Sequence, residues 1–179
     1  MTPTRVLVTL ITVLILALPL AAQSQPAAPA NPLSADANFM WGYAKSIVMR
    51  AAEKMPEANY AFKPVPEVRS FGQVVVHILV EQNGVCASVK GVAKPADPSD
   101  KATKADIVAA LKASNAFCDA AFAGLADANA TEPVNFWGGT HPRVSAISMI
   151  AEHDGEHYGN LVTYMRLKGV VPPTSEPSK

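Results

Sequence analysis

The sequence predicts an all-α four-helix bundle, and three observations support this prediction. Between the two ends of the chain, about 140 residues contain four long segments with apolar residues at helical spacing. Connections rich in proline and glycine separate these segments. Few segments alternate apolar and polar residues with a period of two, so strands are not expected. Helices that each carry one apolar face bury those faces against one another, which gives a single bundle.

The first 24 residues have the order of a secretory signal peptide. Arg5 precedes an apolar run from Val6 to about Leu18, and small residues follow it up to Ser24. We therefore expect residues 1–24 to be cleaved and the protein to be exported, either periplasmic or secreted, with no stable membrane span afterwards. An uncleaved anchor is the alternative, because the run approaches the length needed to span a bilayer.

The first two helices are bounded by recognisable residues. After a Pro/Ala-rich linker at 25–33, the first helix is expected over about 35–54, and Pro56 ends it. The proline-containing connection that follows should be extended. Ser70 is a suitable N-cap for a second helix that runs to about Lys90, because its hydroxyl can accept from a free backbone N–H.

The last two helices also have clear boundaries. The third is expected over about 103–125, where Thr103 and Asp106 resemble a capping pair. The fourth is expected over about 142–168 and stops at a glycine. The bundle domain should therefore cover residues 34–173, and residues 174–179 should form a flexible tail.

The connection at about 91–102 is long enough to change the topology. It can extend to roughly 40 Å, more than the roughly 30 Å of a twenty-residue helix, so it can cross the bundle and leave the second and third helices parallel. A parallel pair would put Cys86 and Cys118 at similar heights. A disulfide suits an exported chain, and buried free thiols are the alternative.

Charge excludes one broad class of function. Lys and Arg total 15, Asp and Glu total 15, and no basic run occurs, so the electrostatic footprint of a nucleic-acid-binding protein is missing. We expect a small-molecule substrate as partner. Apolar bundles of this kind often dimerise, so a homodimer is compatible with the sequence.

The most informative pattern is a pair of histidines in the fourth helix. His153 and His157 are four residues apart, so both imidazoles project from one helix face and can bind one divalent metal ion. An apolar stripe on roughly the same face predicts that they point into the core; it consists of Ile147, Ile150, Leu161 and Tyr164. His77, within an apolar segment, is our choice for the third ligand. His141, which precedes a proline, or a carboxylate could supply it instead, and His77 could be an ordinary core histidine.

Three neutral histidines leave at least one open position on the ion, which is the catalytic rather than the structural pattern for zinc. Zinc is therefore favoured, with nickel, manganese or iron as alternatives. Glu81, one turn after His77, is a candidate acceptor for an imidazole N–H, and the alternative is a solvent-facing charge. Tyr164 is a candidate pocket residue or a core residue. Trp41 and Trp137 are expected to be packing residues.

The five residues from His153 to His157 fit the inverted zincin signature H-x-x-E-H. A peptidase of that class needs a third ligand well downstream, and only a short tail with Glu176 remains there. The usual zincin motif fails because Asp154 stands where it requires glutamate. The sequence therefore does not support a peptidase.

Two segments together resemble the DinB family of small helical metalloproteins. NYAFKPVPEVRSFGQVVVH (59–77) resembles the start of that family's metal site, and EHDGEHYGNLVTYMRLKGVVPP (152–173) resembles its last helix and exit. The resemblance covers about residues 34–173. It implies that His77, His153 and His157 bind a divalent ion and that the bundle runs up-down-down-up. Some family members are thiol-dependent S-transferases or isomerases, and others are described only as metal-dependent hydrolases. The resemblance therefore also implies a thiol as an alternative partner.

Two functions follow as expectations. The first is an exported metal-dependent hydrolase or transferase with an open three-histidine site. The second is a non-catalytic metal- or ligand-binding bundle, such as a carrier or a stress-response accessory. The second function remains an alternative because the sequence offers no convincing general base and no Ser-His-Asp arrangement.

Overall fold

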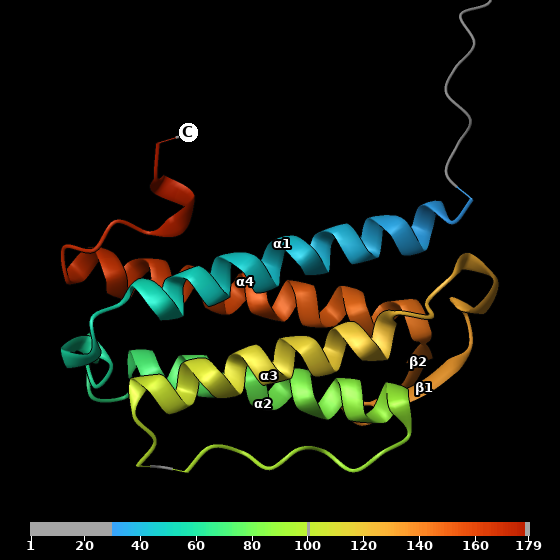
Figure 1. Ribbon diagram of the computed structural model, residues 1–179, viewed down its shortest axis with the longest axis horizontal. Coiled ribbons are helices and arrows are strands. Elements are labelled where there is room, and N and C mark those ends of the chain that lie inside the picture. The colour runs from blue at the N-terminus through green and yellow to red at the C-terminus, as the bar shows by residue number, and fades with distance from the viewer. Residues whose placement is uncertain (1–29, 100, 178–179) are drawn as a thin grey trace, which may run out of the picture.

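The computed structural model describes residues 30–99 and 101–177, and it confirms the all-α four-helix bundle (Figure 1). The predicted signal peptide (1–24) and residues 25–29 of the predicted linker lie outside these residues. No helix in the described ranges combines the length and apolar character that a membrane crossing requires. The helices are α1 (Pro32–Lys54), α2 (Phe71–Lys90), α3 (Lys104–Phe122) and α4 (Arg143–Leu167). Shorter elements are the 3-10 helices η1 (Glu57–Asn59), η2 (Asp127–Asn129) and η3 (Pro173–Ser175), and the strands β1 (Pro133–Phe136) and β2 (Gly139–Pro142).

The helices run up-down-down-up, as the family resemblance implies. Helix α1 packs chiefly on α4, and α2 packs chiefly on α3. Figure 1 shows the segment after α2 returning along the whole bundle before α3 begins, so α2 and α3 are parallel. The long connection between them is this crossover, and α4 lies against both α1 and α2.

Local capping chemistry explains where the helices begin and end. The Ser70 side chain accepts from the Gln73 N–H at 3.2 Å, and the Gln73 side chain accepts from the Ser70 N–H at 2.8 Å. Thr103 and Asp106 form the same reciprocal cap on α3. Gly91 after α2 has φ 65°, a left-handed conformation that costs glycine little. The helix ends match the sequence prediction to within one residue, with two exceptions: α1 begins at Pro32, three residues early and inside the predicted linker, and α3 ends three residues early.

The β1–β2 hairpin is a departure from the predicted absence of strands. The two strands pair antiparallel, with Val134 opposite His141 and Phe136 opposite Gly139. Val134 and Phe136 are buried against the bundle, whereas the alternate residues of β1 are exposed. The alternation expected of a strand is present but covers only four residues, too few to recognise as a periodic pattern.

The two cysteines form a disulfide, which decides the alternative that the sequence left open. Cys86 on α2 and Cys118 on α3 are bonded, with Cα atoms 5.3 Å apart. This requires the two helices to be parallel, because each cysteine lies in the C-terminal half of its own helix. The crossover therefore brings the two cysteines to the same level of the bundle.

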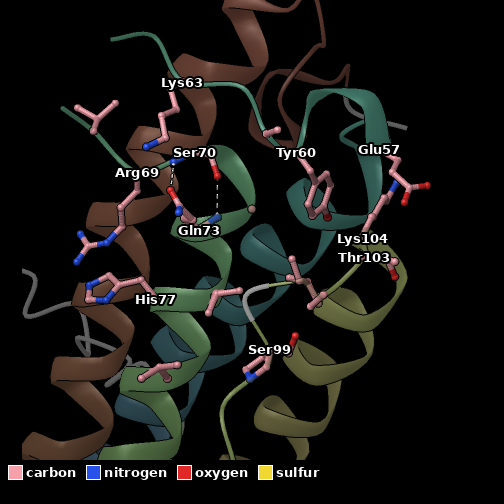
Figure 2. A pocket seen from close by; sticks show the side chains of 18 of the residues that line it. Glu57, Tyr60, Lys63, Arg69, Ser70, Gln73, His77, Ser99, Thr103 and Lys104 are labelled. Atoms are coloured by element: carbon pink, nitrogen blue, oxygen red, sulfur yellow. Dashed lines mark hydrogen bonds between the residues drawn. The ribbon is translucent and has the colours of Figure 1, made fainter. Parts of the chain in front are cut away.

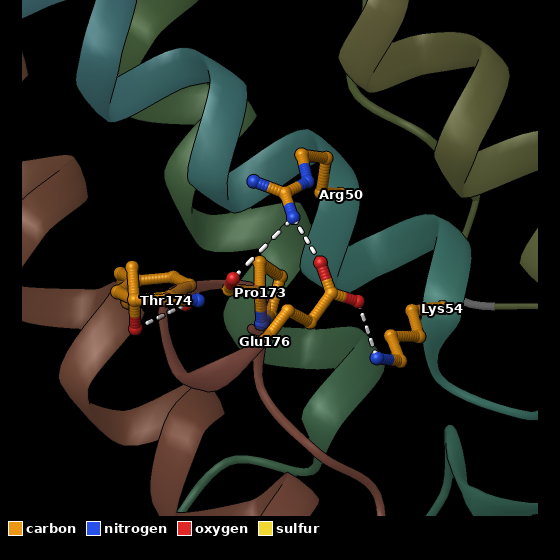
Figure 3. A network of polar contacts seen from close by, with 6 residues as sticks. Arg50, Lys54, Pro173, Thr174 and Glu176 are labelled. Atoms are coloured by element: carbon orange, nitrogen blue, oxygen red, sulfur yellow. Dashed lines mark hydrogen bonds and ion pairs between the residues drawn. The ribbon is translucent and has the colours of Figure 1, made fainter. Parts of the chain in front are cut away.

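The chain after α4 folds back onto α1, although the sequence predicts a flexible tail from residue 174. Glu176 accepts hydrogen bonds from Arg50 and from Lys54, the latter at 2.5 Å (Figure 3). The Tyr158 and Thr174 hydroxyls are 3.0 Å apart, and Pro173 is buried. The first residues of the predicted tail are thus held by contacts to both α1 and α4.

Candidate metal centre

Three histidines from two helices meet between α2 and α4. His77 comes from α2, and His153 and His157 come from α4. One ring nitrogen from each side chain can be chosen so that all three lie within 4.8 Å of one another. The Nε2 atoms of His77 and His153 are 3.2 Å apart. His141 lies elsewhere, on β2, with its ring 4.5 Å from that of Phe136.

The geometry fits a tetrahedral divalent ion. Zinc–nitrogen bonds of about 2.0–2.1 Å at tetrahedral angles place two ligand nitrogens about 3.3 Å apart. The 3.2 Å separation between His77 and His153 is therefore suited to binding one ion. Three imidazole nitrogens with no thiolate also form a donor set that zinc and the neighbouring divalent metals accept.

Asn160, which the sequence prediction missed, orients one of the three rings. Its Oδ1 lies 3.0 Å from Nδ1 of His157. Because an amide oxygen accepts, this contact places the ring proton on Nδ1 and leaves a lone pair on Nε2 for a metal. The i,i+3 spacing of the two residues on a helix was the available signal.

The histidines line the edge of the core rather than its centre, so the expected inward direction holds only in part. His77, His153 and His157 are each half-buried. The fully buried positions beside them on α4 are occupied by Asp154 and Tyr158. One side of the histidine cluster thus remains open for a substrate, as a site at the core centre would not be.

Burial keeps these imidazoles in the form that binds metal. Burial is the main cause that lowers the pKa of His153 to about 4, and the nearby His157 and His77 add to it. Burial also lowers the pKa of His77, followed by the charges of Arg69 and His157. Since metal ligation requires the neutral ring, both side chains are ready to bind at neutral pH.

Trp137 covers one side of the cluster, and the prediction that it is a packing residue is wrong. It is 44% exposed, and its ring centroid lies 5.7 Å from that of His153. Its Nε1–H donates to Glu81 at 2.8 Å. Glu81 therefore contacts the site only indirectly, by accepting this hydrogen bond from Trp137. Within the described ranges it makes no hydrogen bond to an imidazole, the role that the sequence suggested for it. Trp41, by contrast, is buried as expected.

Tyr164 has a positioning contact rather than a place in the pocket wall. It is buried, and its hydroxyl donates to the main-chain carbonyl of Arg69 at 3.0 Å. Arg69 and His77 both line a groove of about 860 Å³ on the outer side of α2. Figure 2 shows the Arg69 guanidinium beside the His77 ring at one side of this groove.

A buried polar chain lies behind the histidines. Ser114 donates to Oε1 of Gln82 at 2.8 Å, and Nε2 of Gln82 donates to Oδ2 of Asp154 at 2.7 Å. Burial raises the pKa of Asp154 to about 8, although the bond from Gln82 opposes this shift. The chain ties α2, α3 and α4 together directly next to His153.

Comparison with known proteins identifies the family. A sequence model described as the DinB superfamily matches residues 44–161. The chain belongs to the DinB superfamily. No curated protein matches it in a sequence search.

Solved structures of DinB-like proteins share the fold. A DinB-like protein from Bacillus cereus ATCC 10987 superposes with a TM-score of 0.65 at 19% identity, covering 76% of this chain and 93% of that one. A DinB-like protein from Bacillus subtilis superposes with a TM-score of 0.63 at 20% identity, covering 80% of this chain and 99% of that one. A mutant of mycothiol-dependent maleylpyruvate isomerase gives 0.61 at 13% identity, covering 72% of this chain and 60% of that one. At these identities the likeness is one of fold.

Proposed function

We propose that this DinB-superfamily protein is an exported metal-dependent enzyme, a hydrolase or a transferase, that binds a divalent ion through His77, His153 and His157. The observation that carries the proposal is the convergence of the three imidazoles at a half-open edge of the bundle. A structural zinc site would instead be closed by a fourth protein ligand. Zinc is the favoured ion, and nickel, manganese and iron remain alternatives.

An ion held by three neutral histidines would supply Lewis acidity and would lower the pKa of a bound water or thiol. The protein's own groups have separate roles. Asn160 fixes the orientation of the His157 ring, while Trp137 shields the His153 side from water. Glu81 holds the Trp137 indole in place through its Nε1–H.

A thiol is one candidate co-substrate. One protein of similar fold is named as a mycothiol-dependent isomerase, and a thiolate could occupy the open position of the ion as an activated nucleophile. Hydrolysis by a bound water is the other candidate. The two reactions need different second reactants at the same open position, so substrate assays can separate them.

Two observations support export. The N-terminal sequence has the order of a signal peptide. The Cys86–Cys118 disulfide suits an oxidising compartment, where such bonds persist. An N-terminal sequence determined on protein recovered from the periplasm or medium should begin near residues 23–25.

The first prediction concerns the metal ligands. Purified protein should contain about one divalent ion per chain, and His77→Ala or His153→Ala should lower its metal affinity at least about tenfold, because each removes one of three ligands. Elemental analysis and competition with a chromogenic chelator measure this. His141→Ala is the matched control, because this histidine lies outside the cluster. Unchanged metal content in both ligand variants would refute the site.

Catalysis needs its own test. Ester, amide and thiol-transfer substrates should be assayed with metal-loaded and chelated protein, and His153→Ala should be assayed beside them. Turnover that requires both the metal and His153 would support the enzyme. Stoichiometric metal binding with no metal-dependent turnover would favour the alternative, a metal- or ligand-binding bundle.

A further inference from the structure

The groove on the outer side of α2 reaches the proposed metal centre. Its volume is about 860 Å³, and its walls are α2, the segment between η1 and α2, and the crossover before α3. His77 belongs both to the groove lining and to the histidine cluster. His153 and His157 are not among the lining residues, so a small molecule in the groove meets the cluster through His77.

Arg69 stands at the point where the groove meets the histidines. Figure 2 shows its guanidinium next to the His77 ring, with Lys63 nearby. In the described ranges, Arg69 makes no ion pair with a carboxylate. Its positive charge lies close enough to His77 to act on that ring electrostatically.

The backbone of Arg69 is held firmly. Its carbonyl accepts from the buried Tyr164 hydroxyl at 3.0 Å. The next residue is the Ser70 cap of α2, and the N–H of Phe71 donates to the carbonyl of Phe62 at 3.0 Å. The backbone therefore fixes where the Arg69 side chain starts, and binding a ligand has to order only the side chain itself.

A cation beside a divalent-ion site is unfavourable unless an anion joins them. Glu81 and Glu156 supply nearby negative charge and act on His77 from the α2 and α4 sides. Glu57 and Glu67 also line the groove, but Figure 2 shows Glu57 at the far end, beside Lys104. Glu67 precedes Arg69 by two residues, but within the described residues the guanidinium pairs with no carboxylate, so the groove presents an unpaired cation near His77.

We propose that Arg69 binds the carboxylate of a small anionic substrate whose reacting end lies at the histidine cluster. The planar fork of arginine matches a carboxylate with two parallel N–H···O bonds. Lys63 adds a second positive charge on the same side of the groove. The inference rests on the proposed function, because it assigns the substrate class of that site.

The test measures binding and does not require turnover. Cobalt-loaded protein is titrated with the monohydroxamate of succinic acid, which binds a metal at one end and carries a carboxylate at the other. The matched compound has a neutral amide in place of that carboxylate. Changes in the cobalt absorption spectrum give both affinities. The wild-type protein should bind the carboxylate compound about tenfold more tightly.

Variants separate the role of Arg69 from general charge. Arg69→Gln should remove the preference for the carboxylate compound, while the variant still binds cobalt at least as tightly as the wild type because a positive charge near His77 is lost. Lys112→Gln makes the same charge change on an exposed part of α3 and should keep the preference. Arg69→Lys should keep part of it, and Tyr164→Phe should reduce it by releasing the Arg69 backbone.

Each outcome bears on one proposal. A wild-type protein with no preference, or an Arg69→Gln variant with the wild-type preference, would overturn the anion subsite while the metal site stands. A wild-type protein that binds no cobalt would refute the proposed function, and the inference that rests on it would fall as well. Circular dichroism would show whether the Arg69→Gln variant is unfolded. In that case Arg69→Lys replaces it: a partial preference for the carboxylate compound would support the anion subsite, and the full wild-type preference would overturn it.

Discussion

At the residue scale, Asp154 is the least expected side chain in the bundle. It is completely buried, its Oδ2 accepts from Gln82, and its Oδ1 has no hydrogen-bond partner within the described ranges. A charged carboxylate in that position would be costly to desolvate. Burial accordingly raises its pKa from 3.8 to about 8.

This raised pKa predicts how stability depends on pH. The folded state binds the Asp154 proton more tightly than the unfolded state does, so the stabilising contribution is complete below about pH 4 and is lost as the pH rises toward 8. Over that window the free energy of unfolding falls by at most about 1.4 kcal/mol per pH unit. Asp154→Asn removes this titration while keeping an acceptor for Gln82. In metal-free protein, the variant should gain stability relative to wild type between pH 5 and pH 7.

Urea denaturation at several pH values measures the difference between variant and wild type. Using the difference cancels the contribution of His153, whose lowered pKa destabilises the metal-free protein as the pH falls from 6.5 toward 4. Asp36→Asn, which removes a carboxyl from an exposed position of α1, is the control for the substitution itself. If the difference for Asp154→Asn did not change with pH, the predicted effect of its burial would be refuted.

At the element scale, the β1–β2 hairpin completes one wall of the site. Its turn consists of Trp137 and Gly138, with φ values of 45° and 77°. Glycine adopts such angles readily, but a tryptophan there is strained by about 1 kcal/mol or more. The strain is retained where the indole contacts Glu81 and lies over His153.

Relieving that strain should not improve the site. Trp137→Gly should leave the free energy of unfolding unchanged or slightly higher, because glycine suits the left-handed turn. Release of bound metal to excess chelator should become about tenfold faster, since a group that shields the ligands is lost. Stopped-flow absorbance with a chromogenic chelator gives the release rate.

Trp137→Phe separates the two roles of the indole. It keeps an aromatic ring over His153 but removes the donor to Glu81. A metal-release rate between those of the wild type and Trp137→Gly would show that both the ring over His153 and the hydrogen bond to Glu81 slow the release. If Trp137→Gly releases metal at the wild-type rate, the hairpin is only a structural connection between α3 and α4.

At the scale of the whole molecule, the disulfide stabilises the parallel packing of α2 on α3. Cys86 and Cys118 are 32 residues apart, and the loop that they close contains the crossover. Closing a loop of this length restricts the unfolded chain and should stabilise the fold by about 3–4 kcal/mol. Cys86→Ala combined with Cys118→Ala should therefore lower the free energy of unfolding by that amount.

Denaturation with and without reductant checks this prediction. Reduced wild-type protein should lose a comparable part of its stability, whereas the double variant should not respond to reductant. A wild-type protein that is indifferent to reductant under denaturing conditions would show that its thiols are not bridged in solution.

Much of the fold could be predicted from the sequence because the relevant signals are local. Ser70, Thr103 and Gly91 mark helix ends through bonds or backbone angles within a few residues. The spacing of His153 and His157 places both rings on one helix face whatever the helix packs against. His77 could be chosen as the third member because its segment had to lie near the core.

Long-range contacts decided the rest. Whether His153 or Asp154 faces the core depends on the small rotation of α4 against α2, and neighbouring residues on a helix differ by only about 100°. The nearness of Trp137 to His153, and of Tyr164 to Arg69, joins segments far apart in the chain. The sequence by itself determined four helices and three candidate ligands. Only the tertiary structure decided which side of the site is open and which cation borders it, because these depend on packing between segments that no local pattern encodes.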